Sequence, residues 1–165
     1  MTQRTLLQWP DPRLRAKAAP VAEISDEIRA LWDDMIEIMD AMPGVGLAAP
    51  QIGVMLQVAV VDASDKRDRR IRMANPELLD ASVVMRDHEE ASPNLPGVSA
   101  TVSRPRGVSV QFLDETGASV RRDFMGLEAT SVQHQIDHLQ GRMYFDRLSK
   151  VKRDMLLRKA RKLQR

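Results

Sequence analysis

The sequence predicts one globular domain that combines helices with short strands. Apolar residues recur every three or four positions in the first third of the chain and again at its C-terminal end, as on amphipathic helices. Between them lie β-rich runs separated by Gly, Pro and Asp, which is typical of strands joined by turns. A chain of 165 residues, 43% hydrophobic and 29% charged, can bury a core and is most simply one domain.

The first third predicts an extended segment and then a helix. Residues 6–21 should be extended, because three prolines disfavour a continuous helix there: Pro10, Pro12 and Pro20. Ser25 and Asp26 offer capping oxygens to a helix that ends near residues 42–44. Its apolar side chains predict a stripe that faces the core rather than a cofactor: Ile28, Leu31, Trp32, Met35 and Met39.

The middle of the chain predicts strands and two irregular stretches. Residues 44–53 contain glycines and alanines that let a backbone or ligand come close, and alone they predict a Gly-rich turn. Asn75-Pro76 should break a strand, and residues 89–97 should form a loop with two prolines. Strands are expected at residues 56–61, 71–74, 78–85, 101–103, 107–113 and 118–124.

Two helices are expected in the last third. One begins near residue 126 and ends at Gly141, which suits the position after a helix, and the other spans residues 148–163. Residues 147–165 carry nine Lys or Arg and one Asp, a net charge of +8, whereas residues 1–146 have a net charge of −6. Such a tail can bind a polyanion such as RNA, or it can be the solvated face of a terminal helix.

Two of the three histidines lie in the predicted helix at residues 126–141. His134 and His138 are four residues apart, so they project from one face of the helix. This spacing lets two imidazoles hold one metal ion, as in the zinc motif HExxH. Gln135 stands where that motif has its glutamate, so the proton acceptor is lost. The alternative interpretation is two histidines on a polar helix face.

Composition excludes several classes of protein. Cysteine is absent, so there is no disulfide framework and no thiolate ligand or nucleophile. No apolar run approaches the roughly 20 residues that span a bilayer, and residues 1–5 lead into no apolar segment of signal-peptide length. We therefore expect a cytoplasmic protein without membrane contact.

Three stretches together resemble the motifs GφGφAAxQ, EGCLS and QHExDH of the bacterial peptide deformylases, which remove the N-formyl group from the initiator methionine of nascent proteins. Residues 44–51 match the first motif, residues 90–94 align with the second, and residues 133–138 match the third. The resemblance runs from about residue 10 to residue 148. It implies an α+β domain, residues 1–148, with antiparallel sheets around a central motif helix and a ligand cleft beside it. It also implies that residues 149–165 form a basic C-terminal helix of the same domain.

The resemblance also implies a metal site and an oxyanion site. In the family, one cysteine and two histidines bind a divalent metal such as Fe, Zn or Ni. The matching positions are Ser92, His134 and His138, and a serine hydroxyl is a poorer ligand than a thiolate. Gln51 matches the family's side-chain donor to the formyl oxygen. Pro93 stands at the backbone donor's position and has no N–H.

The methionine pocket implied by the resemblance is lined by Gly46, Leu127, Thr130 and Ser131. Thr130 stands where the family usually has a branched aliphatic residue. A more polar pocket would bind methionine less well, or would bind something else.

The replacements at Ser92, Pro93 and Gln135, the general-base position, predict a degenerate centre. A general base contributes roughly 10²–10⁴-fold to the rate and one oxyanion donor roughly 10²–10³-fold. We therefore expect weak or vestigial metal binding and little or no deformylation, with peptide or ribosome binding instead. One alternative is an active, divergent metallohydrolase that removes formyl groups from peptide N-termini. The other is an RNA- or ribosome-binding module with a vestigial cleft.

The resemblance suggests two partners for a protein that we expect to be monomeric. One is the N-terminus of a nascent peptide. The other is the ribosome or RNA, because some family members contact the ribosome through basic residues of a C-terminal helix. The comparable residues are Lys150, Lys152, Arg153, Arg158, Lys159, Arg161, Lys162 and Arg165.

Overall fold

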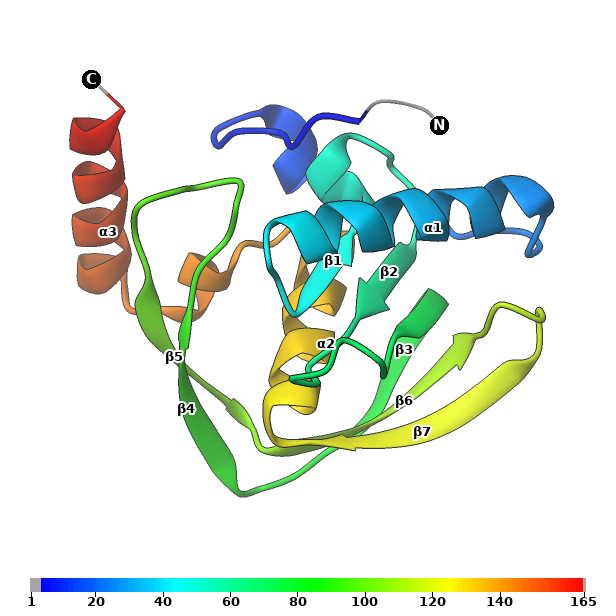
Figure 1. Ribbon diagram of the computed structural model, residues 1–165. Helices are drawn as coiled ribbons and strands as arrows, with labels where there is room; N and C mark the ends of the chain where they lie inside the picture. The colour runs from blue at the N-terminus through cyan, green and yellow to red at the C-terminus, as the bar shows by residue number, and fades with distance from the viewer. Residues whose placement is uncertain (1–3, 165) are drawn as a thin grey trace.

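The computed structural model describes residues 4–164 and contains two antiparallel sheets and three helices in that range (Figure 1). One sheet has the strand order β1-β2-β3-β6-β7, and the other is the pair β4-β5. The strands are Gly46–Ala48 (β1), Val58–Val61 (β2), Ile71–Ala81 (β3), Met85–Glu90 (β4), Ala100–Pro105 (β5), Gly107–Leu113 (β6) and Ser119–Met125 (β7). The helices are Asp26–Ala41 (α1), Gly126–Leu139 (α2) and Lys150–Leu163 (α3). This arrangement confirms the predicted α+β class.

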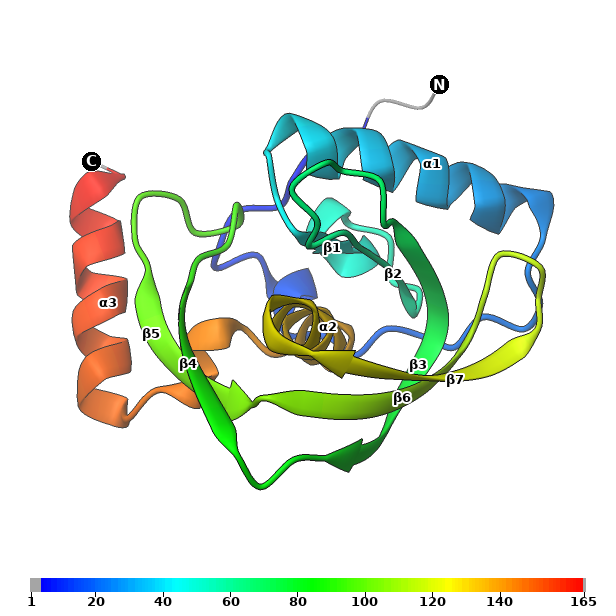
Figure 2. The same cartoon turned by 60° about the horizontal axis from the view of Figure 1, so that its bottom comes forward.

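Helix α2 lies at the centre of the fold, with α1 and the strands of both sheets around it (Figure 2). Gly126 and Gly141, with φ of +62° and +78°, stand at the two ends of this helix, as the sequence predicts. Seven polar or charged side chains of α2 are buried: Thr130, Ser131, Gln133, His134, Gln135, Asp137 and His138. Because buried polar groups need partners, the contacts of these side chains define the site described below. Within residues 4–164 no helix is both long and apolar enough to cross a membrane.

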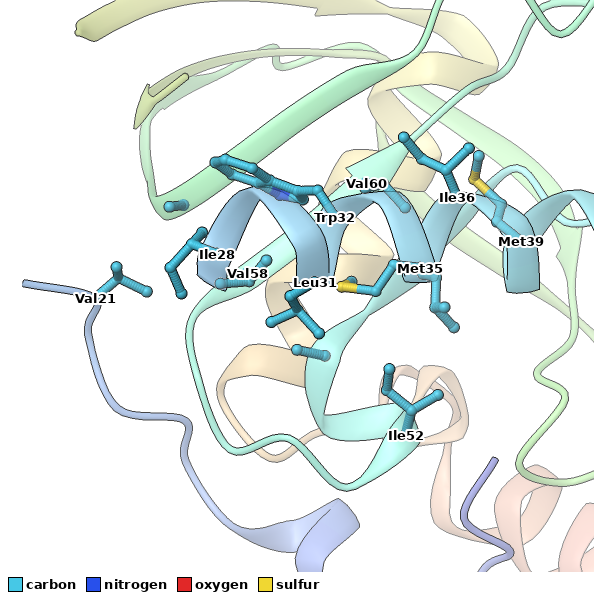
Figure 3. Packing of buried hydrophobic residues seen from close by; sticks show 13 residues of the cluster. Val21, Ile28, Leu31, Trp32, Met35, Ile36, Met39, Ile52, Val58 and Val60 are labelled. Atoms are coloured by element: carbon cyan, nitrogen blue, oxygen red, sulfur yellow. The ribbon is translucent and has the colours of Figure 1, made fainter. Parts of the chain in front are cut away.

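Helix α1 covers one side of the five-stranded sheet and forms its own part of the core (Figure 3). Ser25 caps it by accepting a hydrogen bond from the backbone N–H of Ile28, at 3.3 Å. The indole N–H of Trp32 donates to the backbone carbonyls of Ala59 and Met73, at 3.1 and 3.3 Å, so this buried ring is both packed and hydrogen-bonded. The predicted apolar stripe is buried throughout, which confirms that it belongs to the core.

Two predictions of irregular structure are wrong. Residues 46–48 are not a turn but strand β1, paired with Ala59–Val61 in β2, and a 3₁₀ turn follows at Ala49–Ile52. Asn75 does not end a strand, because β3 runs through it to Ala81 with a bulge between residues 74 and 77. Asn75 adopts φ +51° there, and its amide bonds the backbone N–H and carbonyl of Val21 at 2.7 and 2.8 Å. These two hydrogen bonds tie the bulge in β3 to the segment that precedes α1.

Helix α3 is the predicted amphipathic helix, and it docks through a narrow apolar stripe. Leu156 and Ala160 are buried in a cluster that includes Leu95, Tyr144 and Phe145. Most of its basic side chains are exposed, while Arg165 lies outside the described residues. The docking is therefore apolar and leaves the charge on the surface.

Candidate active site

His134 and His138 face each other on one side of α2. Their Nε2 atoms lie 3.1 Å apart, and both residues are buried. Two imidazole nitrogens bound to one tetrahedral zinc ion at the usual bond length lie about 3.3 Å apart. The structure thus brings together two of the three predicted ligands at the separation that a shared cation requires.

Glu90, at the end of β4, holds the other nitrogen of His134. Its Oε1 lies 2.7 Å from His134 Nδ1, and Arg104 donates to the same carboxylate at 2.7 and 3.0 Å. Burial raises the pKa of Glu90, but the hydrogen bonds from His134 and Arg104 and the charge of Arg104 outweigh it and lower the pKa to about 2. An ionised carboxylate only accepts hydrogen bonds, so we assign the proton of His134 to Nδ1. The Nε2 lone pair is then available to a ligand.

Arg104 joins this carboxylate to a second one on α2. It donates to Asp137 at 2.9 Å, and Arg147 donates to Asp137 at 3.1 and 2.6 Å. Glu90, Arg104 and Asp137 are all buried. These ion pairs fasten the β4-β5 pair to α2 and fix the orientation of the histidine ring. Sequence analysis assigned no role to these three residues.

His138 is held in its neutral form. Its burial, together with repulsion from His134 and Arg104, lowers the pKa of His138 well below the usual 6.5. A neutral imidazole is the form that binds metal, so no proton has to leave His138 before a cation arrives.

Ser92 and Gln51 meet at Asn94, in a second buried network. The Ser92 hydroxyl donates to Asn94 Oδ1 at 3.1 Å, and Gln51 Nε2 donates to the same oxygen at 2.7 Å. Asn94 Nδ2 donates in turn to the backbone carbonyls of Leu7 and Gln51, at 2.6 and 3.1 Å. Because an amide nitrogen carries two hydrogens, Gln51 keeps one N–H for an oxygen in the neighbouring cleft.

A cavity of about 230 Å³ opens beside the histidines, between β1, β4 and α2. The predicted site residues that line it are Gly46, Gln51, Pro93, Leu127, Thr130, Ser131, His134 and Gln135. Ser92 and His138 do not line it. Sequence analysis missed His88 and Glu89, which line the cavity from β4. Their position directly before the EGCLS-like motif, which begins at Glu90, could have indicated them.

Gly46 lets β1 approach α2 closely. A side-chain carbon at this position would lie 2.5 Å from both Gln135 Nε2 and Ser131 Oγ, so a larger residue would displace these two side chains. Ser131 donates to the backbone carbonyl of Val45 at 2.9 Å. Gln135 Oε1 is buried and has no hydrogen-bond partner among the described residues. That free acceptor is available to a water molecule or a cation.

The residues present fit a divalent metal with two imidazole ligands and neutral oxygen ligands. Within residues 4–164, no group of three or more His, Cys, Asp or Glu side chains is placed to hold a metal. The remaining positions would fall to water or substrate, because the Ser92 hydroxyl is hydrogen-bonded to Asn94 and does not line the cavity. Such a donor set binds more weakly than one with a thiolate, but it leaves the full charge of the cation available to polarise a carbonyl.

Comparison with known proteins identifies close relatives. A model of the polypeptide deformylase family matches residues 3–154. A peptide deformylase from Rhizorhabdus wittichii is 41% identical, over all of this chain and 97% of its own length. One from Alkalilimnicola ehrlichii is 42% identical, over 97% of this chain and 90% of its own length.

The fold is also similar to solved structures of peptide deformylases. The peptide deformylase from Legionella pneumophila superposes with a TM-score of 0.91 at 38% identity, over 99% of this chain and 96% of that one. The peptide deformylase from Ehrlichia chaffeensis in complex with actinonin superposes with a TM-score of 0.92 at 33% identity, over 100% of this chain and 99% of that one.

Proposed function

This chain belongs to the polypeptide deformylase family, and we propose that it is an active, divergent metallohydrolase that removes formyl groups from peptide N-termini. The expectation of a degenerate centre with little or no deformylation is corrected by the comparisons. Relatives at 41–42% identity that match nearly the full length are peptide deformylases. A matching structure at TM-score 0.92 is a peptide deformylase in complex with actinonin.

The observation that carries the proposal is the pair of Nε2 atoms 3.1 Å apart at the cleft, with Glu90 on the other side of the His134 ring. The family is metal-dependent, and His134 and His138 would hold its divalent cation here. A bound cation supplies Lewis acidity to the formyl oxygen and to water. Glu90 keeps His134 in the tautomer that this role requires.

The other residues of the cleft bind and orient the reactants. The free N–H of Gln51 donates to the formyl oxygen, and the Oε1 atom of Gln135 accepts a hydrogen bond from the attacking water. In the reaction, the water oxygen bonds to the formyl carbon, the C–N bond breaks, and the proton from water ends on the leaving amine. Gln135 is neutral and does not take that proton, so we expect a slower enzyme than one with a carboxylate at this position.

Metal removal tests the proposal. Chelator-treated protein should release no formate from a formylated tripeptide, and reloading with Fe(II), Ni or Zn should restore the release. Metal content is measured on the same samples, since two neutral imidazoles release their cation more readily than a site with a thiolate. Activity that is unaffected by complete metal removal would contradict the proposed role of the histidines.

We also propose that α3 contacts the ribosome or ribosomal RNA through its exposed basic face. Replacing Lys159 and Lys162 by Gln should weaken cosedimentation with ribosomes, because each replacement removes a contact with a phosphate. Each lost contact should also reduce the slope of the logarithm of the binding constant against the logarithm of salt concentration by about one unit. The control replaces Arg106 and Arg121, two exposed arginines outside α3, by Gln. Equal pelleting of both variants and the wild type would exclude α3 as the contact.

A further inference from the structure

Asn94 is a buried side chain whose hydrogen-bonding capacity is completely used. Its Oδ1 accepts from Gln51 Nε2 at 2.7 Å and from the Ser92 hydroxyl at 3.1 Å. Its Nδ2 donates to the backbone carbonyls of Leu7 and Gln51, at 2.6 and 3.1 Å. Exchanging the two ends of this amide would place its N–H groups against that of Gln51 and its oxygen against two carbonyl oxygens. The network therefore allows only one orientation of the Asn94 side chain.

The side-chain amide of Gln51 is held at both of its ends. Its Oε1 accepts from the backbone N–H of Ala48 at 2.9 Å, while one hydrogen of its Nε2 is donated to Asn94. Gln51 is buried and lines the cavity beside the histidines. Because the amide is planar, fixing its oxygen and one N–H also fixes the direction of the second N–H. That second N–H is the one that the proposed function assigns to the formyl oxygen.

The segment before α1 ties Gln51 and Asn94 together through the backbone. The N–H of Leu7 donates to the carbonyl of Gln51 at 2.9 Å, and the N–H of Trp9 donates to the carbonyl of Asn94 at 2.8 Å. Leu7 and Leu95 are also buried in the same apolar cluster. The backbone of Asn94 is therefore held in place, which pre-organises its side chain to hold Gln51.

We infer that Asn94 is the positioning residue of the oxyanion site, because it aims the free N–H of Gln51 at the formyl oxygen. The inference rests on the proposed function and adds a residue to the same site. Pro93 has no backbone N–H to share this task, so the direction of the Gln51 donor matters more. A donor is most effective when it already points at the developing charge and need not reorient during the reaction. Asn94 does not line the cavity, so it acts through Gln51.

Kinetics of the variants Asn94→Leu and Asn94→Asp test the inference. Both replacements have nearly the shape of asparagine and both remove the Nδ2 donor, but only aspartate keeps an acceptor for Gln51. Asn94→Leu should lower kcat for a formyl-Met-Ala-Ser peptide by at least about tenfold and change KM by less than about twofold, because an oxyanion donor acts mainly on the transition state. Asn94→Asp should keep most of the wild-type kcat. Equal losses of kcat in the two variants would overturn the inference.

A double-mutant cycle with Gln51→Leu separates positioning from a general structural effect. Gln51→Leu alone should lower kcat by about 10²–10³-fold. Adding Asn94→Leu should then lower kcat by no more than about twofold, because the group that Asn94 positions is already absent. A further loss as large as in the wild-type background would overturn the inference. If Asn94→Leu does not fold, Asn94→Ser takes its place in the cycle with the same two outcomes, since its hydroxyl ends one bond closer to the backbone.

Hydrogen exchange of the Gln51 side-chain amide, followed by NMR, separates this inference from the proposed function. The signal is assigned by its loss in Gln51→Leu, and its measurement needs no turnover. If the wild type hydrolyses no formyl peptide, the proposed function fails. Slow exchange of one Nε2 hydrogen in the wild type and faster exchange in Asn94→Leu then still support the positioning role. Equal exchange in the two proteins overturns it as well.

Discussion

Replacing Gln135 with glutamate is expected to raise kcat/KM for formyl peptides by about 10²–10⁴-fold, the range that a positioned general base contributes. The two side chains have the same shape, and Oε1 of Gln135 already lies in the site without a partner. A carboxylate there can take the proton of the attacking water and pass it to the leaving amine, which the amide cannot do.

The control for this variant is Gln140→Glu, which adds the same charge at the exposed end of α2 and should leave the rate unchanged. Metal content is measured for all three proteins, because an added carboxylate can also act as a ligand. If Gln135→Glu gains less than about tenfold at equal metal content, position 135 does not contact the attacking water in this chain.

Replacing Arg104 with methionine is expected to destabilise the protein by about 3–5 kcal/mol, because it leaves two buried carboxylates without their common partner. Glu90 and Asp137 are 5% and 4% exposed, so water cannot replace the guanidinium. Urea unfolding at pH 7 measures the change. Arg106→Met, an exposed arginine two residues away, should cost less than about 1 kcal/mol. Equal costs for the two variants would contradict the role of Arg104.

The ion pair between Glu90 and Arg104 also predicts how the stability of the protein changes at acid pH. The pKa of Glu90 is lowered in the folded state from 4.5 to about 2, so its contribution to stability is fully present above pH 4.5. That contribution is lost as the pH falls toward 2, because the carboxylate must then be protonated. Arg104→Met should lose less stability over this window than the wild type, since its Glu90 has a smaller pKa shift.

Local patterns in the sequence predicted the helices and the histidine pair well. The stripe around Trp32 and the i, i+4 spacing of His134 and His138 depend only on helix periodicity. Strand β1 was missed because its glycine and alanine suggest a turn, and only pairing with β2 reveals it. The bulge at Asn75 was missed because the contact with Val21 that sustains it spans 54 residues.

Only part of the candidate site was predicted, because long-range contacts determine the rest. The three motifs predicted residues on both sides of the cleft, but the sequence does not show which residues pair with the buried charges. Glu90, Arg104 and Asp137 come from three elements, and their roles appear only when these elements pack. The expectation of a degenerate centre was wrong because three replaced positions counted for more in it than the similarity of the whole chain to peptide deformylases.

Formate release is the measurement that tests the central claim most directly. The metal-loaded wild type and His138→Ala are incubated with a panel of formylated tripeptides, and formate and free amine are quantified together. We expect equal amounts of formate and amine from the wild type and none above background from His138→Ala. No excess of formate from the wild type over His138→Ala, with any of Fe(II), Ni or Zn, would contradict the assignment of this chain as a working deformylase.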